Sequence, residues 1–569
     1  MARPLVVIPA LVTAATILAL LGFVIVLSFS KIEDGMIAGF AGFGNFATLL
    51  SDPNLPRMTS NTLVFAGIAL AVSFLLGVPL AWLAERSDLP GRSVIWTVML
   101  ASLVLPGFLV GMGWLLLAHP RIGVLNTTLE NVFHLSFPPL PINNVAGMGL
   151  VEGLLLTSLT FVLVAPSLRT MDPALEEAAR MSGASSRSLL WNVTLPLILP
   201  ALVAAAMYVA IVAVGAFDIP AVIGLGSRIY TFSTFMYVHA YPADGFPDYG
   251  AIAAGGAVMI VIALAMTFAY VYVLRRARSF AVITGKAYRP RLTELGRWTP
   301  AAWALVAVYA LGALIIPFIF TLIYALLPFA EPLDASVFSH MSLLNFAQIP
   351  WGLVLTGALH TAELVLVVPL AVVALSFAIS WIVVRTTMPG RFVLDGIAFM
   401  PHAVPSILFG IGATLAALFL LQKIVPIYGT VTLIGLVYTI GWISFGTRIV
   451  NSSLIQIHSD LLEAGAMSGA RAGAVFRDIV LPLVRPAAFG AWIYVVLLCV
   501  RELTLAAFVS TPKNITLPMV AWFEWNNGSI HSGAAVAVIV VLALIPLLFL
   551  FLQFGPRSDA MFGSSVRER

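Results

Sequence analysis

Long apolar runs constrain this chain more than any other feature. An α-helix needs about 20 consecutive apolar residues to cross a bilayer, and the charged residues that would interrupt such runs make up only 9% of this chain. A soluble domain carries about 25%. We therefore expect an all-α, multi-pass membrane protein with about twelve spanning helices, near 5–28, 62–84, 94–118, 145–168, 196–217, 250–274, 301–328, 358–384, 393–421, 429–450, 482–508 and 533–554.

One short stretch occurs twice. The first signature loop (172–196) contains Glu177-Ala178-Ala179, Gly183 and Leu195-Pro196. The second signature loop (458–482) contains Glu463-Ala464-Gly465, Gly469 and Leu481-Pro482. Matching positions lie 286 residues apart throughout. Spacing kept this closely across half a chain predicts an internal repeat.

The local chemistry of each loop predicts two short helices separated by a glycine. Asp172-Pro173 can start the first helix, as an N-cap followed by proline, and Ser459-Asp460 can start its counterpart. Gly183 and Gly469 suit helix ends, because glycine tolerates the left-handed conformation. The Leu-Pro pair then opens an apolar run, where the N–H that proline lacks costs little.

The repeat extends beyond the loops. Residues 88–92 match 387–391, and Pro106 matches Pro405, each at an offset of 299. The change of offset requires 13 extra residues in the first half, which we expect in the segment 119–144. The chain then divides into repeats at 1–285 and 286–569, each with six spans. An even number of spans makes the two repeats parallel, so that a transport path can lie between them.

The basic residues predict the orientation, because Lys and Arg accumulate in cytoplasmic loops. With the N-terminus in the cytoplasm, six of the 29 Lys and Arg residues fall outside and Arg501 falls at the edge of a span. The remaining 22 fall inside, seven of them in the linker 275–297. Both termini and both signature loops are then cytoplasmic.

The duplicated stretch resembles the cytoplasmic EAA loop of ABC-importer permeases. Both copies carry the Glu, first Ala, Gly and Leu-Pro of that loop, and the second departs from it at Gly465. The resemblance covers nearly the whole chain, and it is greatest to the fused, two-repeat ferric-iron permeases of the type I class. It implies contact with an ATPase through Glu177, Ala178, Ala179, Gly183, Glu463, Ala464, Gly465 and Gly469.

The resemblance also implies the partners of the chain. A separate cytoplasmic ABC ATPase homodimer would bind ATP and Mg, and an extracytoplasmic binding protein would deliver the substrate. The chain itself would be a transport subunit of the bacterial inner membrane, not an enzyme, and would hold no cofactor. Ferric iron is the favoured substrate. Permeases for thiamine, phosphonate and polyamines share the signature, so these substrates remain open.

Two alternative hypotheses assign the chain to other classes of protein. A secondary transporter driven by an ion gradient would favour inverted repeats and an ion site at the midplane, whereas the repeats here are parallel. A membrane-embedded enzyme would need a catalytic constellation, which the sequence does not assemble. A co-purifying ATPase would separate the permease from both alternatives.

The sequence lacks the motifs that ATP binding and metal binding need. Gly285-Lys286 is the nearest fragment to a phosphate-binding loop, but Phe280 stands where that loop needs a glycine. The eight histidines show no metal-ligand spacing, and Cys499 is the single cysteine. The sequence therefore predicts neither metal nor ATP binding by this chain, and nothing beyond the basic linker suggests nucleic acid.

Three charges interrupt the apolar runs that follow the signature loops. Asp218 lies 22 residues beyond Pro196, and Arg501 lies 19 beyond Pro482, followed by Glu502. At about 1.5 Å per residue, a straight helix would bring these charges close to the far side of the hydrocarbon core. We expect Asp218, Arg501 and Glu502 to line or latch the outer end of the path, or else to be ordinary charges at helix ends.

Overall fold

The computed structural model describes residues 4–33, 36–121, 123–134, 138, 140–171, 173–242, 247–278, 292–329, 337–422 and 424–554. Among these residues every named element is helical except for one antiparallel hairpin, in which Ser30 pairs with Phe40. The expected all-α class is confirmed, with this hairpin as a small addition.

The chain forms two compact units, each assembled from separate segments. Unit 1 comprises Met1–Asp52, Met236–Ile260 and Asn345–Arg569. Its elements are α1 (Pro4–Ser28), β1 (Ser30–Glu33), β2 (Met36–Phe40), α2 (Gly44–Leu50), α17 (Trp351–Arg385), α18 (Arg391–Ala403), α19 (Ile407–Ala416), η6 (Ala417–Leu421), α20 (Val431–Gln456), α21 (Ser459–Met467), α22 (Ala472–Val475), η7 (Phe476–Val480), α23 (Leu481–Arg501), α24 (Thr504–Val509), α25 (Leu517–Asn526) and α26 (Ile530–Phe554).

Unit 2 comprises Pro53–Phe235 and Val261–Leu344. Its elements are α3 (Leu55–Arg86), α4 (Ser93–Val104), α5 (Gly107–Ala118), α6 (Val124–Phe133), α7 (Val145–Thr170), α8 (Pro173–Met181), α9 (Ser186–Leu189), η1 (Leu190–Thr194), α10 (Leu195–Gly215), η2 (Pro220–Gly224), η3 (Leu225–Ser227), η4 (Gly296–Trp298), α13 (Thr299–Ala310), η5 (Leu311–Ile315), α14 (Ile316–Leu326) and α15 (Val337–His340). A unit boundary falls within each of α11 (Phe232–Ala240), α12 (Tyr249–Arg278) and α16 (Leu344–Gln348).

Ten helices of the described part are long and apolar enough to cross a membrane, and two bent pairs raise the number to 12. The expected runs 94–118 and 393–421 correspond to the two bent pairs, and the bend within each is a finding of the structure. They are the pairs α4–α5 and α18–α19, bent by 95° and 105°. The cause is proline: the residues before Pro106 and Pro405 are extended, with ψ of 138° and 136°, because a following proline disfavours the helical conformation.

Matching elements confirm the two repeats. The bounds of α20, α21, α22 and α23 equal those of α7, α8, α9 and α10 shifted by 286 residues. The extra residues of the first repeat hold α6, as the change of offset predicted. The side-chain amide of Asn126 fixes this helix by donating to the carbonyls of Ala118 and Leu140, at 3.0 and 3.1 Å.

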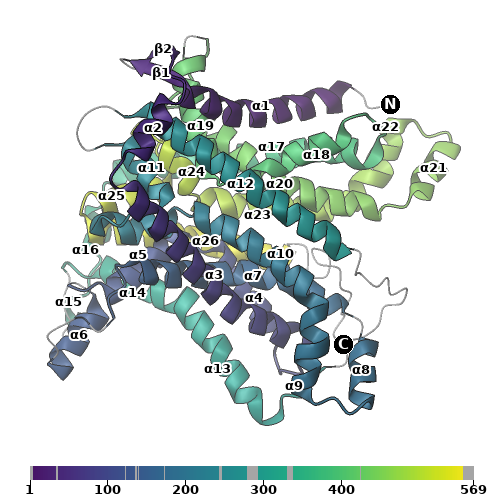
Figure 1. The fold of residues 1–569 in the computed structure, drawn as a ribbon, viewed down its shortest axis with the longest axis horizontal. Helices are drawn as coiled ribbons and strands as arrows, with labels where there is room; N and C mark the ends of the chain where they lie inside the picture. Colours follow the sequence, from purple (N-terminus) through teal and green to yellow (C-terminus); the bar gives the residue numbers. More distant parts are fainter. Residues whose placement is uncertain are drawn as a thin grey trace. The chain divides into compact units, whose positions relative to one another are not determined.

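The first helix of each sequence half packs in the unit that holds the core of the other half. In unit 1, α1 lies along α17 and α18 (Figure 1) and also contacts α19. In unit 2, α13 packs on α3, and the indole N–H of Trp114 in α5 donates to the carbonyl of Gly312 at 2.9 Å. Compact units and sequence repeats therefore divide the chain differently. The boundary at 285/286 lies outside the described residues and stays a prediction about the repeats.

Small residues let the central helices of unit 2 approach closely. Gly149 and Gly153, four residues apart on α7, face Ile68 and Val72 of α3. A Cβ at these glycines would lie 2.8 Å from the Cβ of Ile68 and 2.6 Å from the Cβ of Val72. Such spacing of small residues is typical of membrane helices in close contact. α3 and α7 are therefore closely packed in this unit.

In the equivalent pair of unit 1, α17–α20, the glycine at the helix contact lies on the other helix. Gly77 of α3 faces Thr160 of α7, and a Cβ at Gly77 would lie 2.9 Å from the Cβ of Thr160. At the matching positions Ser376 lies on α17 and Gly446 on α20, with 3.0 Å for the corresponding distance. One glycine satisfies the contact in each repeat, and the helix that carries it differs.

Candidate functional site

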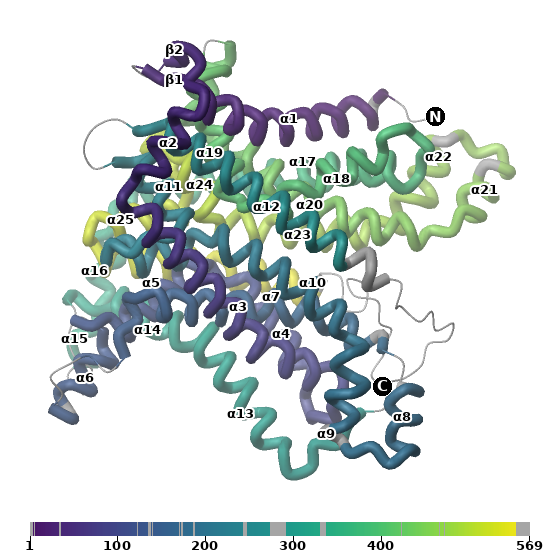
Figure 2. Tube along the Cα trace, in the orientation of Figure 1, coloured from purple at the N-terminus to yellow at the C-terminus, as the bar shows by residue number. Residues whose placement is uncertain are grey.

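The two signature loops have the same path. Figure 2 shows α8 and α21 as short helices from which the trace turns sharply into a second short helix, α9 or α22. A π-helical turn, η1 or η7, then leads into the long apolar helix α10 or α23. The expected order of short helix, glycine, short helix and apolar run is confirmed in both copies. Asp172, the expected N-cap, lies outside the described residues, and α21 begins at Ser459 as expected.

A left-handed glycine ends the first short helix of each loop. Gly183 has φ of +84° and Gly469 has φ of +79°. The next residue folds back, since the N–H of Ala184 donates to the carbonyl of Ala179 at 3.0 Å, and that of Ala470 to Gly465 at 3.3 Å. This six-residue hydrogen bond is the Schellman ending of a helix. The two glycines therefore set the angle between the short helices.

The π-helical turns precede Pro196 and Pro482, each the second residue of a long helix. A proline clashes with the carbonyl four residues earlier and has no N–H to donate. A wider turn relieves this clash without ending the helix. The Leu-Pro pair thus explains why each loop enters its membrane helix through one turn of π-helix.

The expected contact residues differ in exposure between the copies. Glu177 and Ala179 are half-buried and Ala178 is exposed, whereas Glu463 and Ala464 are both exposed. The structure explains why the second loop has glycine at position 465, where it departs from the signature. A Cβ there would lie 2.9 Å from Cδ1 of Ile479, an atom that valine, the residue at the matching position 193, does not have. The smaller residue in the second loop accommodates the larger one.

An exposed apolar stripe on each loop was missed by the sequence analysis. Met181 is 89% exposed and Met467 is 88% exposed, and both end their short helices. Leu175 and Leu461, six residues earlier, are also exposed large apolar side chains. With the intervening alanine, each stripe follows the spacing i, i+3, i+6 of one helix face. The signal was available, because both residues recur at the offset of 286.

A salt bridge anchors the first signature loop. The guanidinium of Arg86, at the end of α3, pairs with the carboxylate of Glu176 in α8. The other oxygen of that carboxylate accepts from the hydroxyl of Thr194 at 2.9 Å. Arg86 is only 2% exposed, and its Nη1 has no hydrogen-bond partner among the described residues. Glu176 therefore ties the short helix to α3 and to the start of α10.

Apolar packing anchors the second loop at the same positions. Leu462 and Val480 replace Glu176 and Thr194. Val480 is buried in a cluster with Val450, Leu454 and Ile457, against which Leu462 packs. Arg385, the counterpart of Arg86, donates instead to the backbone carbonyls of Leu454 and Ile457, the latter at 2.6 Å. Neither anchor was foreseen, because the expectation concerned only Glu177 and Glu463.

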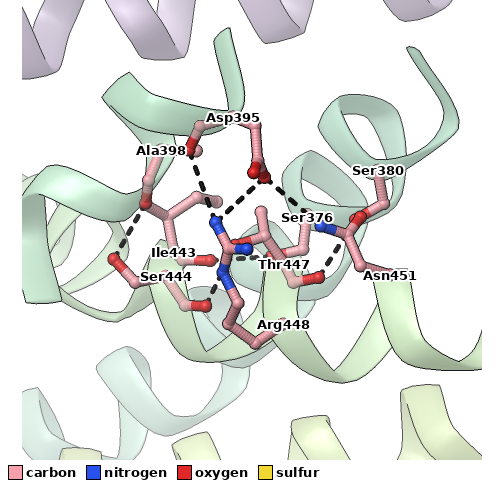
Figure 3. Close-up of polar contacts among 9 residues, drawn as sticks. All are labelled: Ser376, Ser380, Asp395, Ala398, Ile443, Ser444, Thr447, Arg448 and Asn451. Atoms are coloured by element: carbon pink, nitrogen blue, oxygen red, sulfur yellow. Dashed lines mark hydrogen bonds and ion pairs between the residues drawn. The ribbon is translucent and has the colours of Figure 1, made fainter. Parts of the chain in front are cut away.

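A second set of polar contacts ties the helices next to each loop. In unit 2, Arg169 forms a two-pronged salt bridge with Glu85, at 2.8 Å for both nitrogens, and the indole of Trp96 donates to the same carboxylate. Figure 3 shows the set in unit 1, where Arg448 of α20 donates to Asp395 of α18 at 2.9 Å.

Hydroxyl groups surround the Asp395–Arg448 pair. Ser376 and Ser380 of α17 donate to carbonyls of α20, and Ser444 of α20 donates to the carbonyl of Ala398 at 2.9 Å (Figure 3). The side-chain amide of Asn451 donates to Asp395 at 3.3 Å. The first repeat has Trp96 and Val162 at the positions of Asp395 and Arg448. Each repeat therefore joins its helices through a different ion pair.

The three charges expected at the outer end of the path lie at chain connections. Asp218 follows α10, and a Cβ at Gly107, the first residue of α5, would lie 2.8 Å from its Oδ2. Arg501 is the last residue of α23. The carboxylate of Glu502 accepts from the N–H of Leu505, in the first turn of α24, at 2.8 Å. Their expected role in the path remains a prediction.

The described residues contain no group of three His, Cys, Asp or Glu side chains placed to hold a metal ion. Cys499 is buried in the second repeat. Each signature loop therefore presents a short helix with an exposed apolar stripe, next to a long apolar helix of its own unit.

Comparison with known proteins identifies the class. The sequence matches the family described as "Binding-protein-dependent transport system inner membrane component" twice, over residues 77–279 and 378–555. Each match contains one signature loop, and together they cover more than half of the chain. The chain belongs to this family, and it is the permease component of a binding-protein-dependent ABC importer in the inner membrane.

Curated relatives place the chain within that class. It is 22% identical to the ferric transport system permease protein FbpB of Actinobacillus pleuropneumoniae, over 88% of this chain and 72% of the relative. It is 22% identical to the Fe(3+)-transport system permease protein FbpB 2 of Haemophilus influenzae, over 88% and 90%. It is 28% identical to the sulfoquinovosyl glycerol permease SmoG of Agrobacterium fabrum, over 43% of this chain and 80% of SmoG.

Proposed function

We propose that this chain imports ferric iron. The observation that carries the proposal is the length of the match: the two FbpB relatives align over 88% of the chain, across both repeats. SmoG and the trehalose permease SugB of Mycobacterium tuberculosis align over 43% and 46%. Similarity to ferric permeases thus extends to the fused arrangement of two repeats, whereas similarity to these sugar permeases is that of a single repeat.

The two signature loops are the surfaces to which we assign a separate ATPase dimer. Two equivalent loops in one chain offer one contact for each ATPase subunit. An amphipathic helix that enters a groove typically uses apolar anchors on one face. Leu175 and Met181 supply such anchors in the first loop, and Leu461 and Met467 supply them in the second. Glu177 and Glu463 lie beside them and add charge recognition.

The orientation belongs to the same proposal. If the ATPase is cytoplasmic, both signature loops are cytoplasmic, and the even number of spans in each repeat brings both termini to that side as well. A substrate-binding protein then docks on the opposite face. The density of Lys and Arg supports this orientation, although most of the linker that carries them, 279–291, lies outside the described residues.

A reconstituted assembly tests the proposal. The chain is purified together with a co-purifying ATPase and its substrate-binding protein and placed in liposomes, and uptake of radioactive ferric iron is measured with and without ATP. We expect uptake that requires both ATP and the binding protein. Uptake driven by an ion gradient without ATP would contradict the permease assignment. ATP-dependent uptake of thiamine, a phosphonate or a polyamine, with none of iron, would contradict the substrate.

Variants of the apolar stripe test the docking surface in the same assembly. Met181→Asp together with Met467→Asp is expected to weaken ATPase association at least tenfold, since loss of about 1.4 kcal/mol is tenfold and buried anchors exceed this. Met36→Asp is the matched control, because Met36 is also an exposed methionine but lies on the hairpin. Equal ATPase association in the loop variant and the control would refute the assigned surface.

A further inference from the structure

One arginine of unit 1 lies in an apolar helix and uses its salt bridge only in part. Arg448 belongs to α20, one of the candidate membrane spans, and its side chain is 45% exposed. It lies eight residues before Gln456, the last residue of α20, which is about 12 Å along the helix. Charged side chains inside membrane helices are costly, and they usually face a partner or a water-filled cavity. Arg448 therefore requires an explanation beyond its pairing with Asp395.

The guanidinium of Arg448 donates through one nitrogen only. Its Nη2 donates to the carboxylate of Asp395 at 2.9 Å and to the backbone carbonyl of the same residue at 3.5 Å. A guanidinium has five N–H groups, and those on Nε and Nη1 make no hydrogen bond with any residue that the structure describes. Arg169 of unit 2 differs, because it uses two nitrogens on both oxygens of Glu85 and is only 16% exposed. The Asp395–Arg448 pair therefore leaves exposed donors, which the Glu85–Arg169 pair does not.

The surroundings hold Arg448 in place. The ring of Phe399 in α18 lies 5.0 Å from its guanidinium carbon, within cation–π distance. Figure 3 shows the hydroxyl groups of Ser376, Ser380 and Ser444 joining α17, α18 and α20 around the salt bridge. A long basic side chain normally moves its charge toward water, but the salt bridge and the ring restrain this one. Its remaining N–H groups are therefore held at one exposed place.

A buried amide adds a hydrogen-bond acceptor beside the arginine. Asn451, three residues later on α20, is 8% exposed, and its Nδ2 donates to Oδ1 of Asp395, the same atom that Arg448 contacts. The Oδ1 of Asn451 is buried and has no hydrogen-bond partner among the described residues. An unpaired buried acceptor costs free energy, which a hydroxyl group of a ligand would recover. The two side chains together offer donors to an anion and an acceptor to a hydroxyl group.

The first repeat shows that the fold does not need this charge. Val162 occupies the position of Arg448, and Trp96 occupies that of Asp395. Arg169 corresponds instead to Ile455, seven residues nearer the signature loop, or about 10 Å along the helix. The arginine at this depth is therefore a property of the second repeat alone.

We propose that Arg448 and Asn451 bind a phosphate-type oxyanion in the second repeat. A planar guanidinium suits the oxygen atoms of a phosphate group, and Asp395 holds it without using its Nε and Nη1. Basic residues between membrane helices typically bind the headgroups of acidic lipids, and a soluble phosphate offers the same chemistry. The proposal does not depend on the transported substrate.

The test has two arms, both on the full-length chain. In the first, binding of phosphatidylglycerol to the chain in detergent is followed by native mass spectrometry. In the second, binding of radioactive inorganic phosphate to the chain in phosphatidylcholine nanodiscs is followed by equilibrium dialysis. Arg448→Gln removes the charge, and adding Asp395→Asn removes its partner as well, so that no carboxylate is left unpaired. Arg57→Gln is the matched control, because it makes the same change at an exposed arginine near the start of α3.

We expect Arg448→Gln to weaken binding about tenfold in one arm, since hydrogen bonds to charged groups are strong enough for that loss. The double variant behaves alike, and Arg57→Gln matches the unmodified chain. Loss in the first arm identifies a lipid headgroup as the ligand, and loss in the second identifies a soluble anion.

Asp395→Asn alone separates a binding site from a purely structural salt bridge. It keeps Arg448 and removes the nearby negative charge, so anion binding is expected to stay or to tighten. Loss of binding in Asp395→Asn equal to that in Arg448→Gln would show that the salt bridge only shapes unit 1, and would overturn the inference. So would binding by Arg448→Gln and the double variant equal to that of Arg57→Gln in both arms.

Discussion

The first signature loop is held by a salt bridge, whereas the second is held by apolar packing and by backbone carbonyls. In the first, Arg86 pairs with Glu176, which also accepts from Thr194. In the second, Leu462 and Val480 take the places of Glu176 and Thr194, and Arg385 turns to the carbonyls of Leu454 and Ile457. Helix bounds and glycine conformation are nevertheless the same in both loops.

The comparison teaches that backbone geometry and anchoring chemistry are separable in this protein. A buried ion pair loses much of its Coulomb energy to desolvation, so an apolar pair of similar volume can replace it at little net cost. The arginine is kept in both copies and finds whichever oxygen atoms are available, carboxylate or carbonyl. What each copy cannot tolerate is half of an anchor, because that leaves a buried charge without a partner.

The largest loss of stability is expected when one partner of the Arg86–Glu176 salt bridge is removed. Glu176→Leu leaves the guanidinium of Arg86 buried and unpaired, which typically costs about 3–5 kcal/mol. We expect a clearly lower midpoint of thermal unfolding for the purified chain, measured by tryptophan fluorescence. Glu177→Leu, at the next position of the same helix, is the control and is expected to unfold near the unmodified chain.

A second substitution sharpens this test. Adding Arg86→Leu to Glu176→Leu removes both charges and is expected to recover most of the lost stability. If Glu176→Leu unfolds at the same temperature as Glu177→Leu, Arg86 has found carbonyls as Arg385 does, and the two anchors differ less than we infer.

A smaller effect is expected from exchanging the glycine between the central helices. Gly77→Ser introduces the residue of the second repeat, but its Cβ would lie 2.9 Å from that of Thr160. Such overpacking costs about 1–3 kcal/mol. Adding Thr160→Gly recreates the Ser376–Gly446 arrangement and is expected to restore stability beyond either single variant. Additive losses in this double-mutant cycle would show that the two helix pairs are not equivalent.

The smallest effect is expected at the glycine turns of the loops. Gly183→Ala and Gly469→Ala each force a Cβ into the left-handed region, at a cost of about 1–2 kcal/mol. No other atom lies within 4 Å of the added Cβ in either case, so the cost is that of the backbone alone. Hydrogen exchange of the two loops is expected to rise equally. Gly183→Asn and Gly469→Asn are milder controls, and unequal responses would reveal a contact in one loop only.

Local patterns predicted much of this fold. The glycine turns, the Leu-Pro starts of α10 and α23 and the position of α6 all follow from short-range chemistry or from the change of repeat offset. The two spans were expected but their bends were not, although Pro106 and Pro405 match in the repeat, because two apolar segments around a proline have the same hydropathy whether the span is straight or broken. Leu175 and Met181 were missed because, in an apolar sequence, composition does not separate exposed apolar residues from those of a neighbouring membrane helix.

The sequence by itself determined that this is a duplicated membrane permease, because apolar length and a repeated motif are properties of neighbouring residues. Only the tertiary structure decided which side chains anchor the signature loops and the helices next to them. Arg86 and Glu176 are 90 residues apart, and Glu85 and Arg169 are 84 residues apart. No periodicity marks such pairs, since their contact depends on how α3, α7 and α10 pack together.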